Sequence, residues 1–274
     1  MARDHGPALL AAALAAAERG WRVFPLRPDT DLPAGHTANR CPRNGRCAGG
    51  HLTPDHRATT ELELIRQCWQ HAPYGVGIAT GPSHLVVIVL DVPADPRDVP
   101  PKRWARPGVR DGLDVFAVVC EEAGQHWPTT TYSARTDRGT FHLYFAAPTQ
   151  PPIQSRLGAL GWKTAVRADG GYVPAAGTVI EGQLVRVVHD GAPAPLPAWL
   201  AHRLTPPSAA ARPAGHPDDP GLKVRTSGTP AADWTCRCGH QEHVRGRAAV
   251  ADLVGRARTG SCPHQQPTAK EAAA

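Results

Sequence analysis

Lysine and long apolar runs are scarce in this chain of 274 residues. Lysine occurs only at positions 102, 163, 223 and 270, so arginine supplies most of the basic charge behind the formal net charge of +6. A basic surface attracts phosphates, but the chain is also rich in alanine, proline and glycine, and a composition of this kind weakens the argument from charge. No stretch approaches the roughly 18 apolar residues of a membrane span, so we expect no membrane association.

The N-terminal stretch MARDHGPALLAAALAAAERGW imitates a secretory signal in its early arginine and short apolar run. Glu18 and Arg19 follow that run at once, and no small-x-small cleavage site precedes a polar start. We expect instead an amphipathic helix over residues 7–19 that ends at Gly20. The protein is then expected to be cytoplasmic, with its seven cysteines reduced and available as metal ligands or core residues.

Periodicity along the chain predicts a mixed α+β domain followed by a linker and a small module. Helices are expected over residues 60–72, with a Thr60 N-cap, and over 112–124 and 196–204. Strands are expected over 21–26, 84–91, 129–135, 140–145 and 184–190, a strand and turn over 74–81, and a strand that runs into a glycine turn over 163–178. The continuous apolar run at 84–91 is typical of a central strand covered on both faces. Residues 27–58 form a turn-rich insertion, 205–232 a Pro/Ala/Gly-rich linker, 233–266 a small Cys/His module and 267–274 a tail.

The succession ERGWRVFPL, IRQCW, YGVGIATGPSHLVVIVLDVP, TFHLYF and VRADGGYVPAAGT resembles the bifunctional primase-polymerase (Prim-Pol) domain of the archaeo-eukaryotic primase superfamily. The likeness covers about residues 7–204 and implies that residues 1–204 form a Prim-Pol-like domain. It implies an α+β fold, with an RRM-like antiparallel sheet and flanking helices. It also implies template-directed nucleotidyl transfer in DNA replication, with DNA and nucleoside triphosphates as partners, Mg²⁺ or Mn²⁺ as cofactor and a separate helicase for unwinding.

The same resemblance assigns roles to residues of this chain. Its small-x-His element, which contacts nucleotide phosphates, corresponds to Thr140-Phe141-His142, and strand alternation puts Thr140 and His142 on one face. Arg138 and Arg167 are the other expected phosphate-facing groups. Asp91 and His142 are the expected catalytic residues.

Two of the three metal-binding acids of the family are absent. The Asp-x-Asp pair falls on Val89 and Asp91, and the third acid falls on Ala165; the alternative register pairs Asp91 with Pro93, which also lacks the acid. Two other acids lie close in sequence to these positions: Asp95 follows Asp91, and Asp169 follows Ala165. Asp169 would share a face with Ala165 if the strand stayed regular. Because two divalent ions require several anionic oxygens, polymerase activity is expected to be weak or lost.

Two groups of cysteine and histidine have spacings that suit structural zinc. His36, Cys41, Cys47 and His51 lie in the turn-rich insertion, with His56 nearby, and offer the N/S ligands that tetrahedral Zn²⁺ favours. The second group, Cys236, Cys238, Cys262 and either His240 or His264, would hold together a module too small to fold on its own core. A loop with incidental histidines and a partly disordered tail are the respective alternatives.

Three functions remain open at this point. The first is an active primase or polymerase, and the second is a non-catalytic, zinc-stabilised domain that binds DNA or nucleotide and recruits replication partners. The third is a protein-interaction domain without affinity for nucleic acid. The arginines of the C-terminal helical stretch, Arg245, Arg247, Arg256 and Arg258, either contact phosphates or form a solvated face.

Overall fold

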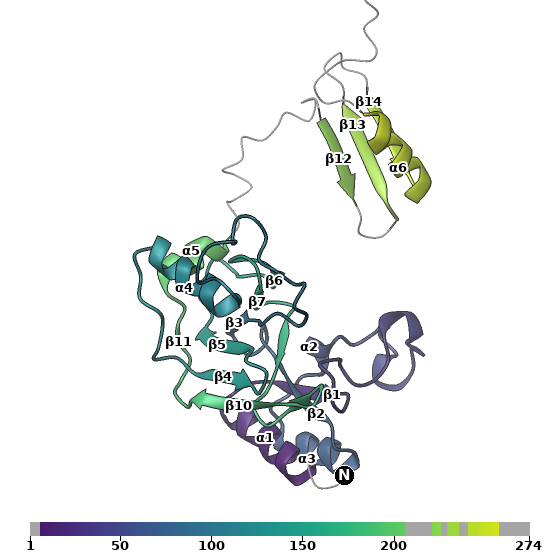
Figure 1. The fold of residues 1–274 in the computed structure, drawn as a ribbon. Helices are drawn as coiled ribbons and strands as arrows, with labels where there is room; N and C mark the ends of the chain where they lie inside the picture. Colours follow the sequence, from purple (N-terminus) through teal and green to yellow (C-terminus); the bar gives the residue numbers. More distant parts are fainter. Residues whose placement is uncertain (1–5, 206–220, 226–228, 236–240, 258–274) are drawn as a thin grey trace, which may run out of the picture. The chain divides into compact units, whose positions relative to one another are not determined.

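The structure is a computed structural model that describes residues 6–205, 221–225, 229–235 and 241–257 (Figure 1). The chain divides into two compact units, Met1–Pro206 and Pro207–Ala274. The first unit has a mixed α+β fold. Its helices are α1 (Gly6–Glu18), α2 (Pro54–Arg57), α3 (Leu62–His71), α4 (Gly112–Glu122) and α5 (Ala198–Leu204).

A large sheet forms the centre of the first unit, with the strand order β6-β7-β3-β5-β4-β10-β9. The pairs within this order are antiparallel, and a short strand, β11, pairs in parallel with β5. The strands are β3 (Leu85–Leu90), β4 (Ser133–Thr136), β5 (Phe141–Ala146), β6 (Arg156–Leu157), β7 (Thr164–Arg167), β9 (Val179–Ile180), β10 (Gln183–His189) and β11 (Ala194–Pro195). The hairpin expected around residues 136–139 is confirmed, because β4 and β5 pair directly.

Strand β3 is buried on both faces, as its apolar run predicts. Its odd-numbered residues Leu85, Val87 and Val89 belong to a core that also contains residues of α1 and α3. Its even-numbered residues Val86, Ile88 and Leu90 belong to a second core that contains residues of α4 and α5. Figure 1 shows these two helix pairs on opposite sides of the sheet. Each buried aliphatic side chain of this size contributes about 1.5–3 kcal/mol to folding.

A second, three-stranded sheet has the order β1-β2-β8, with β1 (Val23–Leu26), β2 (Gly75–Ala79) and β8 (Tyr172–Pro174). The strand expected to run into a glycine turn within residues 163–178 is present as β7 (Thr164–Arg167) of the large sheet, and the chain continues after the turn as β8 of the small sheet, a strand that the sequence analysis did not predict. The break falls at Gly170 and Gly171. Gly170 has a φ of +67°, and a Cβ at Gly171 would lie 2.2 Å from Ser155 Oγ, so the chain turns there without room for a side chain.

The boundaries of the first helices test the capping arguments. Helix α1 ends as expected, since Gly20 has a φ of +80° and its N–H donates to the Ala17 carbonyl oxygen. The expected Thr60 cap of α3 is wrong. Glu61 occupies the N-cap position without a side-chain cap, and the Glu61 N–H donates to Thr59 Oγ1, so the preceding threonine stabilises the chain entry instead.

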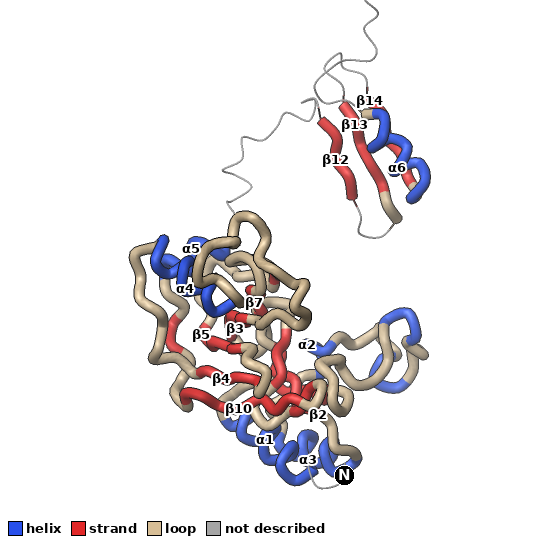
Figure 2. Tube along the Cα trace, viewed as in Figure 1, coloured by secondary structure: helices blue, strands red, loops and turns tan. Residues whose placement is uncertain are grey.

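The insertion at residues 27–58 consists mainly of loops with short helical turns, which Figure 2 shows as predominantly tan tube. The turns are Ala38–Arg40, Gly45–Cys47 and α2. Single bridges from Leu26 to Pro33 and from Asp29 to Ile180 fix its start against the sheets. The segment contributes only Ala34, Cys47 and Ala58 to the buried apolar residues, so apolar packing gives it little stabilisation.

The second unit contains a three-stranded antiparallel sheet, β12 (Gly221–Arg225), β13 (Ala231–Thr235) and β14 (Gln241–Arg245), and helix α6 (Arg247–Arg256). Its core is formed by Ala232, Trp234, Val250 and Leu253, with Leu222 packed against them. The linker expected over residues 205–232 is too long, because β12 and the start of β13 lie inside it. The alternation of Leu222 and Val224 is a two-residue signal that the surrounding Pro/Ala/Gly composition obscures.

Within the described ranges, no helix is both long enough and apolar enough to cross a bilayer.

Candidate functional site

Two positions at which the resemblance leads us to expect metal-binding acids, Val89 and Ala165, lie with His142 in one row across the large sheet. Val89 of β3 pairs with His142 of β5 on one side and with Ala165 of β7 on the other. Directly paired residues of an antiparallel sheet project to the same face. The exposed fractions of Val89, His142 and Ala165 are only 9%, 3% and 3%, so the row is closed by packed side chains.

A cavity of about 300 Å³ opens beside the end of this row. All five residues expected from the sequence to act in catalysis or nucleotide binding line it: Asp91, Arg138, Thr140, His142 and Arg167. They come from the end of β3, the β4–β5 turn, β5 and the end of β7. The structure therefore brings together, from four segments, the groups that were assigned separately along the chain; we call this the Asp91 cavity.

Asp91 is held in place by backbone hydrogen bonds to the residue before β7 and to the start of α4. Its N–H donates to the Lys163 carbonyl oxygen at 2.8 Å, and its carbonyl oxygen accepts from the Gly112 N–H at 2.8 Å. A Cβ at Gly112 would lie 2.2 Å from the Lys163 carbonyl oxygen, so only glycine allows this approach. Asp111 caps α4 by accepting from the N–H groups of Leu113 and Asp114, which fixes the helix start.

The Asp91 carboxylate lies in a mixed environment. Burial raises its pKa, while the hydrogen bond from Thr140 and the nearby charges of Lys163 and Arg167 act in the opposite direction. Thr140 Oγ1 donates to Asp91 Oδ1 at 3.2 Å. One oxygen of the carboxylate is thus already engaged by the threonine that the small-x-His element contributes.

His142 lies at the floor of the Asp91 cavity. Its Nδ1 atom is buried and has no hydrogen-bond partner within the described part of the chain. Burial and, to a smaller extent, the positive charge of Arg167 together lower the pKa of His142 to about 4. At neutral pH the ring is therefore uncharged, and it offers a ligand a neutral donor or acceptor while the arginines supply the positive charge.

Two acids that the sequence analysis missed also line the Asp91 cavity. Asp31 comes from the start of the insertion, and Glu181 from the turn between β9 and β10. The pair Glu181-Gly182 has positive φ values of 49° and 73°, so it is a tight hairpin tip. The acid-glycine pair between two apolar segments indicates such a tip in the sequence, but no local pattern connects it to Asp91.

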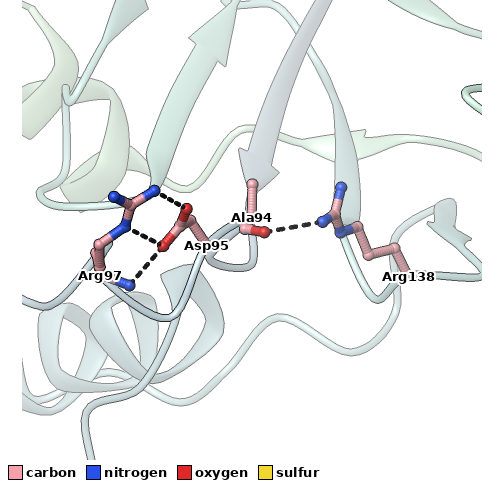
Figure 3. A network of polar contacts seen from close by, with 4 residues as sticks. All are labelled: Ala94, Asp95, Arg97 and Arg138. Carbon is pink, nitrogen blue, oxygen red and sulfur yellow. Dashed lines mark hydrogen bonds and ion pairs between the residues drawn. The ribbon is translucent and has the colours of Figure 1, made fainter.

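Asp95 and Asp169, the two acids close in sequence to the motifs, contact groups outside the Asp91 cavity. Figure 3 shows the Asp95 carboxylate paired with Arg97, at 2.8 Å from its Nη2, while Arg138 on the other side donates to the Ala94 carbonyl oxygen at 3.2 Å. Asp169 accepts from Gln154 Nε2 at 3.1 Å, because β7 ends at Arg167 and the chain turns before reaching it. Neither carboxylate is among the residues that line the Asp91 cavity.

The histidine and cysteine residues of the insertion form a compact cluster. Ligand atoms of His36, Cys41, Cys47 and His51 all lie within 4.8 Å of one another, and Cys47 Sγ is 3.7 Å from His36 Nε2. Tetrahedral Zn²⁺ with N and S ligands requires separations of roughly 3.3–3.8 Å, so a small contraction would complete the site. His51 Nδ1 is buried without a hydrogen-bond partner in the described ranges, while His56 contacts Thr53 instead.

The second Cys/His group, Cys236, Cys238, His240, Cys262 and His264, lies outside the described residues. Within the described part of the second unit, the guanidinium of Arg256 forms ion pairs with Glu242 and Asp252, which neutralise one of the four arginines considered for phosphate contact. Arg245 donates to His243, and His243 is itself paired with Asp233. Arg258 lies outside the described ranges.

A family model described as "Bifunctional DNA primase/polymerase, N-terminal" matches residues 13–199 of this chain, which is more than half of its length. The chain belongs to the Prim-Pol family. Membership associates it with primase/polymerase-like nucleotidyl transfer and with binding of DNA and nucleotides. A search of the curated proteins finds no match.

Prim-Pol domains usually use divalent metal ions, and two of the positions expected from the resemblance to hold them, Val89 and Ala165, carry no carboxylate, although Asp31 and Glu181 add carboxylates to the cavity from other segments. Two adjacent ions need several carboxylate oxygens to offset their repulsion. Here the row beside Asp91 is completed by the apolar side chains of Val89 and Ala165. The Thr140 hydroxyl and the Arg167 guanidinium suit a phosphate better than a metal ion.

Proposed function

We propose that the Asp91 cavity binds nucleoside triphosphate or the phosphate backbone of DNA, while template-directed nucleotidyl transfer is weak or lost. One observation carries this proposal: Val89 lies between His142 and Ala165 in a single cross-strand row, and both Val89 and Ala165 are buried. The cavity still has groups that can bind phosphate, since Arg138, Thr140 and Arg167 line it. The groups that bind are retained, and two of the groups that would hold metal ions are replaced by hydrocarbon.

The strand order β7-β3-β5-β4, with α4 between β3 and β4, supports assigning these four strands to an RRM-like core. In that assignment, β3 and β5 are the two central strands. His142 and Val89 then lie at the middle of the sheet surface, where a ligand on this face would have access to both β7 and the β4–β5 turn. The small sheet and the insertion are additions to this core.

We also propose that the Cys/His cluster of the insertion is a structural zinc site. A set of two cysteines and two histidines leaves no open position for catalysis. The segment also has little buried apolar surface, so a metal ion would supply much of the free energy that orders it. On this basis and that of the family resemblance, we propose a metal-stabilised replication protein that acts on DNA in the cytoplasm and depends on a separate helicase for unwinding.

Two assays on the purified full chain test the main proposal. Binding of ATP and of a short DNA duplex with a single-stranded overhang is measured over a series of salt concentrations, and phosphate contacts should make the affinity fall steeply as salt rises. The change Arg138→Ala plus Arg167→Ala should weaken this binding. Affinity that is independent of salt and of both arginines would instead favour a protein-interaction domain without nucleic-acid function.

Primer extension with Mg²⁺ or Mn²⁺ tests the catalytic half. We expect product formation close to the level without protein. Robust extension by the native chain that Asp91→Ala abolishes would contradict the loss of activity. In that case Asp31 and Glu181, the other carboxylates of the cavity, would be the next residues to substitute.

A further inference from the structure

A second and larger cavity lies between the insertion and helix α3. Its volume is about 640 Å³, within the roughly 300–1,000 Å³ typical of small-molecule sites. Residues of β1, the insertion, α2 and α3 line it, and it shares no lining residue with the Asp91 cavity. We call it the α3 cavity; nothing in the proposed reaction uses it.

The floor of the α3 cavity is apolar. Val23, Ala58, Ile65 and Trp69 line it with exposed fractions of 1%, 5%, 0% and 4%. The Trp69 Nε1–H already donates to the Tyr74 carbonyl oxygen, so the indole contributes mainly apolar surface. A ligand that fills this cavity would therefore place an apolar or aromatic body against the floor.

The rim of the α3 cavity is basic and contains no carboxylate. Arg46, His56, Arg57 and His71 line it, and no Asp or Glu is among the lining residues that the structure describes. Such a rim attracts an anion, because two guanidinium groups close together repel each other unless a negative charge lies between them. Arg and His donors are suited to phosphate oxygens.

Arg57 is the central group of this rim. Its Nη1 donates to the Ala34 carbonyl oxygen at 2.8 Å, and its Nε is buried without a hydrogen-bond partner in the described ranges. Burial lowers the pKa of Arg57; the thiol of Cys47 opposes this effect, and the charge of Arg46 adds to it. A half-buried guanidinium whose Nε lacks a hydrogen-bond partner in the described ranges carries a desolvation cost, and an anionic ligand would offset that cost.

The basic rim is tied to the Cys/His cluster by the chain itself. Arg46 directly precedes Cys47, and His56 and Arg57 follow His51 by a few residues. Cys47 and His51 both belong to the cluster in the insertion. A metal ion bound there would fix the loop that carries Arg46 opposite α3, so the shape of the cavity depends on the occupancy of the cluster.

We propose that the α3 cavity is a second nucleotide site, which binds a nucleoside triphosphate with its phosphates at Arg46 and Arg57 and its base or sugar against the apolar floor, in a manner that requires metal in the cluster. Many anions with an apolar or aromatic body would fit this cavity, and the choice of a nucleotide among them rests on the proposed function. The site itself rests on the volume, floor and rim of the cavity. It is a binding site without chemistry, distinct from the Asp91 cavity.

The test is calorimetric titration of the full chain with ATP, in a variant whose Asp91 cavity is disabled by Arg138→Ala plus Arg167→Ala. We expect one ATP to bind still. Adding Arg46→Ala should weaken it by about 10-fold to 100-fold, the equivalent of one charge-assisted hydrogen bond. Arg46 is exposed, so the fold should survive its removal, and thermal unfolding checks this.

Arg43→Ala is the matched control, because Arg43 is an exposed arginine of the same insertion that lines neither cavity. It should leave the affinity unchanged, and removal of metal by dialysis against a chelator should abolish binding. Equal loss with Arg43→Ala and Arg46→Ala, or retained affinity without metal, would overturn the proposal. So would equal affinity for inorganic tripolyphosphate, since the apolar floor would then contribute nothing.

The converse variant separates this inference from the proposed function. With Arg46→Ala alone, ATP that binds at the Asp91 cavity should remain and should be lost on adding Arg138→Ala and Arg167→Ala. If the first cavity fails and the α3 cavity binds, only the proposed function is wrong. If ATP binding disappears with Arg138→Ala plus Arg167→Ala, the α3 cavity is not a nucleotide site.

Discussion

A functional site needs both a packed scaffold and a complete set of chemical groups. The sheet row at Val89, His142 and Ala165 has the scaffold, and the insertion at residues 27–58 has the chemical groups. The row lies in a packed core, but two of its positions, where the resemblance leads us to expect acids, carry hydrocarbon side chains. The insertion has little core, yet its four ligand residues are all present and lie together. The comparison teaches that the fold of a site and its functional groups depend on different interactions. Packing of apolar side chains maintains the fold of the row, whereas the geometry of the ligand atoms defines the cluster in the insertion.

Substitution of a cysteine in the Cys/His cluster should have the largest effect, a loss of bound zinc, and it tests whether the insertion holds a metal ion. Cys47→Ser replaces a buried thiolate ligand with a poor one, so the zinc content measured by mass spectrometry should fall by one ion per chain. Cys68→Ser is the control, because Cys68 lies on α3 outside the cluster. An unchanged zinc content in the Cys47 variant would remove the metal from our account of the insertion.

Protonation of His142 should produce the next largest effect and tests the packed row. The folded pKa of about 4 lies below the ordinary histidine value of 6.5, so the unfolded state binds more protons between these values. The free energy of unfolding should therefore fall by up to about 3 kcal/mol as the pH drops from 6.5 to 4. The contribution is complete above pH 6.5.

His142→Gln, which cannot titrate, should flatten this dependence. Denaturant unfolding at a series of pH values measures the difference between the native and variant curves, which removes the contributions of other groups. The buried Asp91 carboxyl has a raised pKa and acts with the opposite sign, so it cannot imitate the histidine. Parallel curves for the native chain and the variant would show that His142 is not buried as a neutral ring.

Gly112→Ala should have a smaller effect and tests how the packed scaffold positions Asp91. The added Cβ would lie 2.8 Å from Asp91 N as well as 2.2 Å from the Lys163 carbonyl oxygen, so the backbone must shift. We expect a loss of about 1–3 kcal/mol in the free energy of unfolding. Gly108→Ala is a control for an added Cβ near the same helix, although its φ of +89° carries its own strain. Equal stability of native chain and Gly112→Ala would contradict the close approach.

Asp95→Ala should have the smallest effect. Its carboxylate is paired with Arg97 on the surface and does not line the Asp91 cavity, so ATP affinity should stay unchanged. Arg138→Ala, from the neighbouring contact in Figure 3, should lower that affinity. A loss of ATP binding with Asp95→Ala would mean that this acid takes the place of one of the missing carboxylates.

The sequence predicted the central features of the fold because they are local. The apolar run of β3 indicated burial on both faces, and the turn at residues 136–139 indicated the β4–β5 hairpin. The convergence of Arg138, His142 and Arg167 followed from the family resemblance. In each case, the information lies within a few residues or in a motif.

The remaining features depend on contacts between distant segments. Asp31 and Glu181 reach the Asp91 cavity from segments 150 residues apart, joined through the bridge of Asp29 to Ile180, and no pattern of neighbouring residues encodes that bridge. The division of residues 163–178 between two sheets depends on the tight approach at Gly171. The α3 cavity likewise exists only because the insertion folds back over α3.

Primer extension by the native chain beside the variant Val89→Asp plus Ala165→Asp tests the central claim most directly, with circular dichroism as the check that the variant remains folded. We predict no extension by the native chain and measurable Mg²⁺- or Mn²⁺-dependent product from the variant, because only the acids are missing from the row. Extension by the native chain that Asp91→Ala abolishes would contradict the account.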